Sequence, residues 1–287
     1  MNWQNYLQRQ YTGDTANVYG LEISRYLSSC LGAATAAYKD ILTYIGTLRS
    51  RYTNASTLNR ILCSIKAYYD YLCESGQRPD NPAASIVLKD PRSRDIQLQD
   101  LFTMTELEAL LNRPERYGLL VSRNKVLMSL LVYQALYPAE IEALHLEAVG
   151  LEAGTIQIKA TAKTDSRQLS LKPNQILLFY EYIREVRPQL LNGRISDALL
   201  IGQRGAPMTA EDITKQVKRS FTGLYPGRTV NAQTIRQSVI AHLLKQGHDL
   251  SVVQAFAGHK YPSTTERYRQ NAIETLKAAI DQYHPLH

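Results

Sequence analysis

The sequence predicts a mainly α-helical chain of two domains, the second made α+β by one small β-hairpin. Its 287 residues exceed the usual size of a single domain. Apolar residues recur at helical spacing along most of the chain, and alternation typical of strands is confined to two short stretches. Residues near 89–99 are polar and proline-punctuated and lack this periodicity, so we interpret them as a linker.

The first domain is predicted to be entirely helical. Apolar spacing indicates helices over Val18–Leu31, over 41–48 and over 58–72. Ser56 can cap the last of these helices, because its side-chain oxygen can accept a backbone N–H of the first turn. Gly76 lies where a left-handed residue ends a helix at little cost, so we expect the helix to end just before it.

The second domain is predicted to mix helices with a hairpin. Thr103 or Thr105 can cap a short helix, and Val126–Leu136 is apolar on most faces, which is typical of a buried helix. Alternating apolar and polar residues predict two hairpin strands at 155–159 and 167–171. Further helices are expected at Asn174–Val186, Ala210–Phe221, Asn231–Lys245, Leu250–Ala257 and Ser263–Tyr283.

The charge, the cysteines and the apolar stretches of the sequence indicate which kind of partner and which compartment to expect. The net charge of +7 is shared between both halves of the chain, which suits a protein that contacts a polyanion along its length. Cys30, Cys63 and Cys73 include no C-x-x-C pair, so neither a disulfide framework nor a zinc site is indicated. No stretch approaches the ~18 apolar residues of a membrane span, and the first residues do not resemble a secretory signal. We therefore expect a soluble protein of the reducing cytoplasm.

Four short segments near the C-terminus carry the functional signal: Gln233–Arg236, His242–Gly247, Ala257–His259 and Ser263–Tyr268. They place an arginine early in a helix that ends at glycine, then a Gly-His pair, then a tyrosine nine residues after the histidine. This string resembles the C-terminal signature of the tyrosine recombinase (phage integrase) family. Residues 56–83 are similar to the family's helical core-binding domain, so the resemblance covers nearly the whole chain.

The resemblance implies a role for each matching residue. Tyr268 would attack a DNA phosphodiester and form a 3′-phosphotyrosine. Arg236 would bind the nonbridging phosphate oxygens, for which a bidentate guanidinium is suited, and His259 would hydrogen-bond and pack beside it. The family places on the hairpin loop a lysine that protonates the leaving 5′ oxygen, and here Lys163 is the first candidate and Lys159 the second. Such strand exchange requires neither a metal nor another cofactor, and the sequence has no P-loop.

The resemblance also implies an organisation and a partner. Residues 1–88 would form the core-binding domain and 100–287 the catalytic domain, with a C-terminal helix over 270–287. Both domains would grip double-stranded DNA, on which four protomers would assemble through that helix. Arg60 and Lys66 lie off the apolar face of their helix, so they face either DNA or water. The protein would work in the bacterial cytoplasm, on the nucleoid when bound to DNA.

Two positions depart from the family. Its first arginine lies in a Gly-Leu-Arg-x-x-Glu-Leu segment, and here Tyr137 stands in that arginine's place. Gln233 replaces the histidine of the His-x-x-Arg box and cannot shuttle a proton. Losing one preorganised donor typically lowers a rate by about 10²–10³-fold. Three basic residues from elsewhere could supply the missing charge: Arg123, Lys159 and Arg204.

The sequence therefore leaves more than one function open. The first is a site-specific DNA recombinase or integrase that breaks and rejoins strands through Tyr268. The second is an attenuated or inactive recombinase-like protein that binds DNA in a sequence-specific or accessory role. A third is an unrelated helical regulator, which would be favoured if Arg236, His259 and Tyr268 did not share one cleft.

Overall fold

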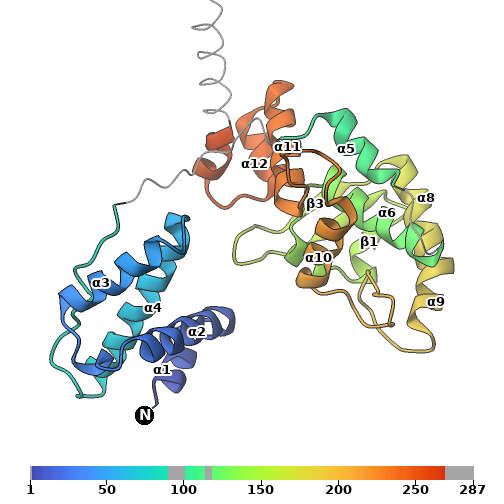
Figure 1. Cartoon of the computed structure of the whole chain (residues 1–287). Helices are drawn as coiled ribbons and strands as arrows, with labels where there is room; N and C mark the ends of the chain where they lie inside the picture. The colour runs from blue at the N-terminus through green and yellow to red at the C-terminus, as the bar shows by residue number, and fades with distance from the viewer. Residues whose placement is uncertain (1, 90–100, 114–117, 269–287) are drawn as a thin grey trace, which may run out of the picture. The chain divides into compact units, whose positions relative to one another are not determined.

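A computed structural model describes residues 2–89, 101–113 and 118–268, and this part of the chain is mainly helical with one small sheet (Figure 1). The predicted fold class is thereby confirmed. By its internal contacts the chain divides into two compact units, Met1–Arg94 and Asp95–His287. The C-terminal helix expected from the sequence, and nearly all of the predicted linker, lie outside the described residues.

In its described part, the first unit is a set of helices around one apolar core. The α-helices are α1 (Trp3–Gln10), α2 (Gly13–Ser29), α3 (Tyr38–Arg49) and α4 (Ala55–Glu74). Helix α2 packs against α4, where the hydroxyls of Tyr26 and Tyr69 hydrogen-bond at 2.7 Å. This bond lets two large aromatic rings be fully buried without leaving their polar ends unpaired.

The helix ends of the first unit correct one expectation and confirm another. Asn54, not Ser56, caps α4: its side chain accepts the N–H of Ser56, which already belongs to the first turn. Gly76 has φ +70° just after the end of α4, as predicted. Helix α1 was not predicted, because Tyr6 and Leu7 are its only buried side chains and they make no periodic pattern.

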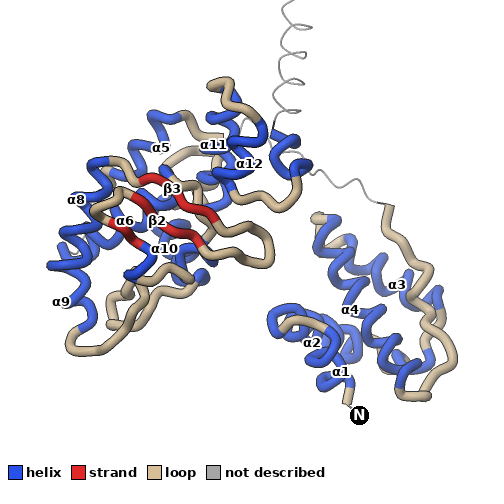
Figure 2. The backbone as a smooth tube through the Cα atoms, turned by 180° about the vertical axis from the view of Figure 1, so that it is seen from behind, coloured by secondary structure: helices blue, strands red, loops and turns tan. Residues whose placement is uncertain are grey.

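The second unit packs helices around a three-stranded antiparallel sheet in the order β1-β2-β3 (Figure 2). Its strands are β1 (Val149–Gly150), β2 (Thr155–Ile158) and β3 (Arg167–Ser170). Its α-helices are α5 (Met104–Leu111), α6 (Gly118–Tyr133), α7 (Pro138–Glu142), α8 (Pro173–Glu181), α9 (Arg187–Leu191), α10 (Ala210–Phe221), α11 (Ala232–Lys245) and α12 (Leu250–Ala257), and residues 262–268 are also helical. The predicted hairpin is β2 and β3, and β1 adds a third strand that is too short to show alternation.

Several boundaries in this unit differ from the sequence prediction. Thr103 caps α5, with Glu106 completing a reciprocal capping box. The helix expected to begin at Asn174 starts one residue earlier and continues through a π-helical turn, Tyr182–Val186, into α9. Helix α6 ends sooner than expected, because Ala135 takes the left-handed φ of 51°.

That left-handed turn after α6 determines where the next residues lie. Leu136 is buried directly after it, and Tyr137 has extended backbone as the residue before α7. Pro138 then occupies the first helical position, where its fixed φ favours a helix start. The turn therefore brings Tyr137 next to Arg236 of α11, a helix that packs against α6.

Candidate active site

Arg236 lies on the inner face of α11 and is 1% exposed. Its Nη2 donates to the carbonyl of Ala257 at 2.6 Å, and its Nη1 donates to the carbonyl of Ala135. The third nitrogen, Nε, is buried and has no hydrogen-bond partner in the described structure. The guanidinium is therefore fixed between the end of α12 and the turn after α6, and its Nε–H is unused.

Tyr137 covers one face of this guanidinium. The Arg236 Cζ lies 4.0 Å from the centroid of the Tyr137 ring, which is a close cation–π contact. Burial lowers the pKa of Arg236, while Tyr137 and Glu140 act in the opposite direction. An arginine stays charged even so. Tyr137, which the sequence analysis aligned with the family's first arginine, thus packs on Arg236.

His259 follows Gly258, whose left-handed φ of 68° ends α12. The buried imidazole places Nδ1 2.8 Å from the hydroxyl of Thr265, and its Nε2 has no partner in the described structure. Burial, with the charges of Arg236 and Arg167, lowers the pKa of His259 to about 4. The ring is therefore neutral at pH 7. When Nδ1 accepts from Thr265, Nε2 carries the proton and is an unused donor.

Tyr268 lies in the helical segment 262–268 and is 8% exposed. Its ring stacks on that of His259, with the centroids 6.4 Å apart and the planes at 15°. Burial raises the pKa of Tyr268 to about 12, although the charge of Arg236 acts to lower it. The structure thus brings Arg236, His259 and Tyr268 into one cluster, with a phenol that is protonated at neutral pH.

The two candidate lysines lie near the hairpin. Lys163 is exposed in the loop that extends beyond β2 and β3 (Figure 2), and its backbone N–H donates to Thr161 Oγ1 at 3.1 Å. Lys159 Nζ lies 3.5 Å from a carboxylate oxygen of Glu147. Both side chains of this ion pair are largely exposed, so it holds Lys159 only weakly, and the choice of Lys163 over Lys159 stays a prediction.

The loop that carries Lys163 is attached to the turn that carries His259. Thr164 and His259 form an isolated antiparallel bridge, and the Asp165 N–H donates to the carbonyl of Gly258 at 2.9 Å. Residues about 95 positions apart in the chain are therefore held side by side by backbone hydrogen bonds, whose geometry changes little with side-chain identity.

The sequence analysis missed two residues of this site, Arg167 and Glu140. They form a buried bidentate ion pair, with Arg167 Nη1 at 2.7 Å from Glu140 Oε1. A signal was present, because Arg167 occupies the same strand face as Leu169 and Leu171, which are buried. An arginine in phase with core leucines indicates a buried charge and hence a partner.

The structure gives the surroundings of the other residues named from the sequence, each within its own unit. Gln233 is exposed on the first turn of α11. Arg123 is buried, and its Nη1 donates to the carbonyl of Ile201 at 3.4 Å. Arg204 is exposed and lines a hollow with Arg123. In the first unit, Arg60 is half-exposed and pairs with Glu22 at 3.3 Å, and Lys66 donates to the carbonyl of Ala84 at 2.9 Å.

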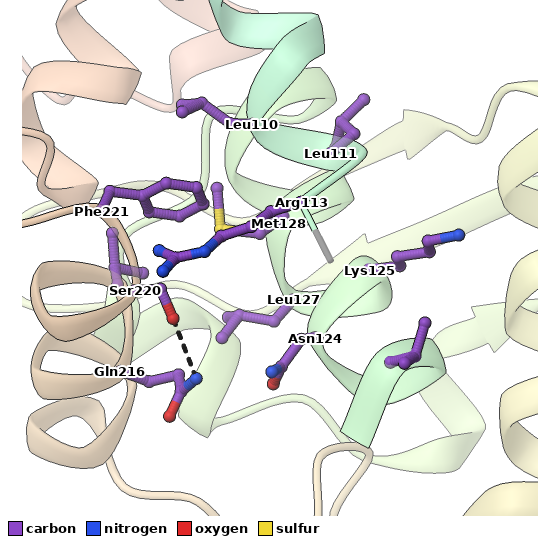
Figure 3. A pocket seen from close by; sticks show the side chains of 12 residues that line it. Leu110, Leu111, Arg113, Asn124, Lys125, Leu127, Met128, Gln216, Ser220 and Phe221 are labelled. Carbon is purple, nitrogen blue, oxygen red and sulfur yellow. Dashed lines mark hydrogen bonds between the residues drawn. The ribbon is translucent and has the colours of Figure 1, made fainter. Parts of the chain in front are cut away.

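A separate hollow lies between α5, α6 and α10 (Figure 3). Arg113 lies over the ring of Phe221 there, and Gln216 hydrogen-bonds Ser220 at 3.1 Å. The described residues that line it include none of the cluster around Arg236, and most are apolar. We interpret it as a packing seam between helices.

The described residues lack two further features. Within them, no three side chains of His, Cys, Asp or Glu gather closely enough to hold a metal ion. No helix in this part of the chain combines the length and the apolar character needed to cross a membrane.

The pKa of His259 predicts a dependence of stability on pH. Between pH 6.5 and about 4 the unfolded chain binds a proton at this residue that the folded chain does not. The contribution of neutral His259 is therefore fully present above pH 6.5 and is lost as the pH falls toward 4. We expect the free energy of unfolding to drop by about 3 kcal/mol across this window from this residue.

Urea unfolding of the wild type and of His259→Gln, at neutral pH and near pH 4, measures this loss. Carboxylates titrate in both proteins, so the difference between the two isolates His259. A difference that does not change with pH would contradict the assignment of a neutral, buried imidazole.

The comparisons with known proteins agree with this geometry. A model described as the phage integrase family matches residues 101–275, which is more than half of the chain. The chain belongs to this family, the tyrosine recombinases, which are DNA strand-transfer enzymes. The resemblance inferred from its C-terminal segments is thereby confirmed.

Named relatives include tyrosine recombinase XerD of Staphylococcus aureus, which is 27% identical over 241 residues, covering 84% of this chain and 80% of that protein. XerD of Staphylococcus saprophyticus is 23% identical over 285 residues, covering 97% of this chain and 95% of that protein.

Among solved structures, XerH site-specific recombinase bound to palindromic difH in a post-cleavage complex aligns with a TM-score of 0.71, at 21% identity over 93% of this chain and 78% of that chain. The Tn1549 transposon integrase in complex with transposon right end DNA aligns with a TM-score of 0.68, at 16% identity over 99% of both chains. Both structures share the fold of this chain.

Proposed function

We propose that the chain is a site-specific recombinase that breaks and rejoins DNA strands through a 3′-phosphotyrosine on Tyr268. One observation carries this proposal: two buried nitrogens beside Tyr268, Arg236 Nε and His259 Nε2, have no partner in the described structure, and both are donors when His259 Nδ1 accepts from Thr265. An unpaired buried donor costs about 1–3 kcal/mol, so a fold retains it where a ligand pairs with it. The nonbridging oxygens of a phosphodiester are suitable acceptors for both.

The chemistry follows from this arrangement. The Oη of Tyr268 forms a bond to phosphorus, the bond from phosphorus to the 5′ oxygen breaks, and the phenol proton passes to water. Lys163 gives a proton to the leaving 5′ oxygen. Arg236 and His259 hydrogen-bond the nonbridging oxygens as their negative charge increases. A 5′ hydroxyl from the partner strand then reverses the step, so no bond energy is lost.

The replaced residues make the site less cationic than the family pattern. Tyr137 offers a neutral hydroxyl where that pattern has a guanidinium, and Gln233 offers an amide where it has an imidazole. The charge of Arg167 is offset by Glu140. We therefore expect a slower enzyme than the full pattern would give, by about 10²-fold for each lost donor that nothing replaces.

The likeness to recombinases solved with DNA supports double-stranded DNA as the substrate. We extend the proposal to assembly of four protomers on DNA through residues 270–287, and to action on the nucleoid in a bacterial cytoplasm. Arg60 and Lys66 are proposed DNA contacts of the first unit. Arg60 would have to exchange or share its ion pair with Glu22 to reach a phosphate.

A nicked suicide substrate tests the proposed reaction. The DNA carries the sequence that flanks the protein's own coding region, and the nick lets the released fragment diffuse away so that the covalent product accumulates. We expect a protein–DNA adduct that survives denaturation. Specific binding to the same DNA without any adduct would instead indicate a catalytically silent DNA-binding protein.

A further inference from the structure

Arg167 and Glu140 form a closed, buried ion pair beside the cluster around Arg236. The exposed fractions of their side chains are 6% and 0%. Nη1 and Nη2 of Arg167 donate to the two carboxylate oxygens at 2.7 Å and 3.2 Å, and its Nε donates to the carbonyl of Phe256 at 2.8 Å. All three guanidinium nitrogens thus have acceptors, and four of the five N–H donors of this arginine are used within the fold.

The carboxylate of Glu140 connects three segments of the second unit. Its Oε2 accepts the backbone N–H of Tyr137 at 2.8 Å, at the start of α7. Its Oε1 accepts the hydroxyl of Thr164 at 2.6 Å, in the hairpin loop. With the two bonds from Arg167 on β3, each carboxylate oxygen accepts two hydrogen bonds. The loop and α7 are therefore tied to one buried group.

The guanidinium of Arg167 also closes the junction with the turn after α12. A Cβ added at Gly258 would lie 2.5 Å from Nη1 of Arg167, so only glycine lets the two approach this closely. The bond from Arg167 to Phe256 and the backbone bond from Asp165 to Gly258 lie on either side of this contact. The turn that carries His259 and the loop that carries Lys163 thus meet at Arg167.

The free-energy cost of burying this ion pair indicates that the pair does more than stabilise the fold. Moving two charges out of water is expensive, and apolar residues of similar volume often stabilise a fold equally well. Burial acts to raise the pKa of Glu140, but the hydrogen bonds and charge of Arg167 outweigh it and hold that pKa below its ordinary value. The pair therefore stays ionised, and a fixed, ionised pair imposes one geometry on the segments that it joins.

We infer that Arg167 is a positioning residue of the active site: with Glu140 it holds the loop of Lys163 against the turn of His259. This inference rests on the proposed function, because it assigns Lys163 the protonation of the leaving oxygen. Arg167 acts through Lys163 and does not itself contact the phosphate. Without it, Lys163 would remain on the chain but would reach the 5′ oxygen less often.

A substrate with sulfur in place of the scissile 5′ bridging oxygen tests this role. A thiol has a pKa of about 8.5, so sulfur leaves as a thiolate and needs no proton donor. We expect Arg167→Gln to slow adduct formation on the ordinary DNA by about 10²-fold, and to lose most of that defect on the sulfur DNA. Lys163→Ala should show the same pattern, since both changes remove the same proton transfer.

Arg228→Gln is the matched control, because Arg228 forms another arginine–carboxylate pair of the second unit, with Glu106. This variant loses an arginine–carboxylate pair of the same domain. It should not slow adduct formation on one of the two DNAs more than on the other. An Arg167→Gln defect of equal size on both substrates would overturn the inference, because it would show a role outside leaving-group protonation. An unchanged rate on the ordinary DNA would overturn it as well.

Hydrogen exchange supplies a readout that does not depend on catalysis. In the full-length protein we expect the amides of residues 163–165 to exchange faster in Arg167→Gln than in the wild type or Arg228→Gln. Unchanged exchange there would overturn the positioning role. If wild-type protein forms no adduct on either DNA, the proposed function fails, and the exchange result still decides whether Arg167 holds the loop.

Discussion

Tyr268→Phe is expected to abolish the covalent protein–DNA adduct while leaving DNA affinity nearly unchanged. The phenyl ring can still stack on His259, so the change removes the attacking oxygen and little else. Loss of a nucleophile has cost about 10⁶-fold in a well-studied hydrolase, so the adduct should fall below detection. Denaturing gels measure the adduct, and a gel-shift titration of the same DNA measures affinity.

Tyr261→Phe provides a matched control, because Tyr261 is an exposed tyrosine just before the same helical segment. It should form the adduct at the wild-type rate. An adduct that persists in Tyr268→Phe would show that another residue is the nucleophile. A loss of DNA affinity as large as the loss of adduct would likewise count against the assigned role.

Arg236→Lys is expected to lower the rate of adduct formation by about 10²–10³-fold, the usual effect of removing one preorganised donor. A lysine ammonium cannot reproduce the planar fork that bonds the carbonyls of Ala135 and Ala257 while Nε stays unused. At least one buried carbonyl would lose its partner, so the free energy of unfolding should also fall by about 1–3 kcal/mol.

Single-turnover cleavage of nicked DNA and urea unfolding measure the two effects separately. Arg184→Lys, at an exposed position before α9, controls for the exchange of an arginine for a lysine. Cleavage at the wild-type rate in Arg236→Lys would remove Arg236 from the proposed mechanism. A rate loss without a stability loss would mean that its carbonyl contacts contribute little to the fold.

The sequence predicted several helices of the second unit well, because local signals determine them. Ala210–Phe221 and Leu250–Ala257 were predicted at their observed bounds, and Asn231 caps α11 at the predicted start. Where two local signals compete, the sequence is less decisive. Asn54 and Ser56 are both good capping residues, and the path of the backbone into α4 decides between them.

The contacts within the site were harder to predict, because they join segments that are distant in the chain. Periodicity can show that Arg167 lies on a buried face, but it cannot name Glu140 as its partner, 27 positions away. The bond from Arg236 to Ala135 spans 101 positions and depends on a left-handed turn at a residue that is not glycine. No local pattern encodes that combination.

The place of Arg236 between two carbonyls has a consequence for how related chains diverge. Because this side chain connects the end of α12 to the turn after α6, losing it would disturb the fold as well as the chemistry. In a descendant that no longer cleaved DNA strands, selection for a stable fold would still retain such an arginine. Among the described contacts, the hydroxyl of Tyr268 makes no hydrogen bond that supports the fold. Mutation could therefore remove it without loss of stability once cleavage was no longer selected. Within this lineage, the phenol is therefore a better marker of a working enzyme than the guanidinium.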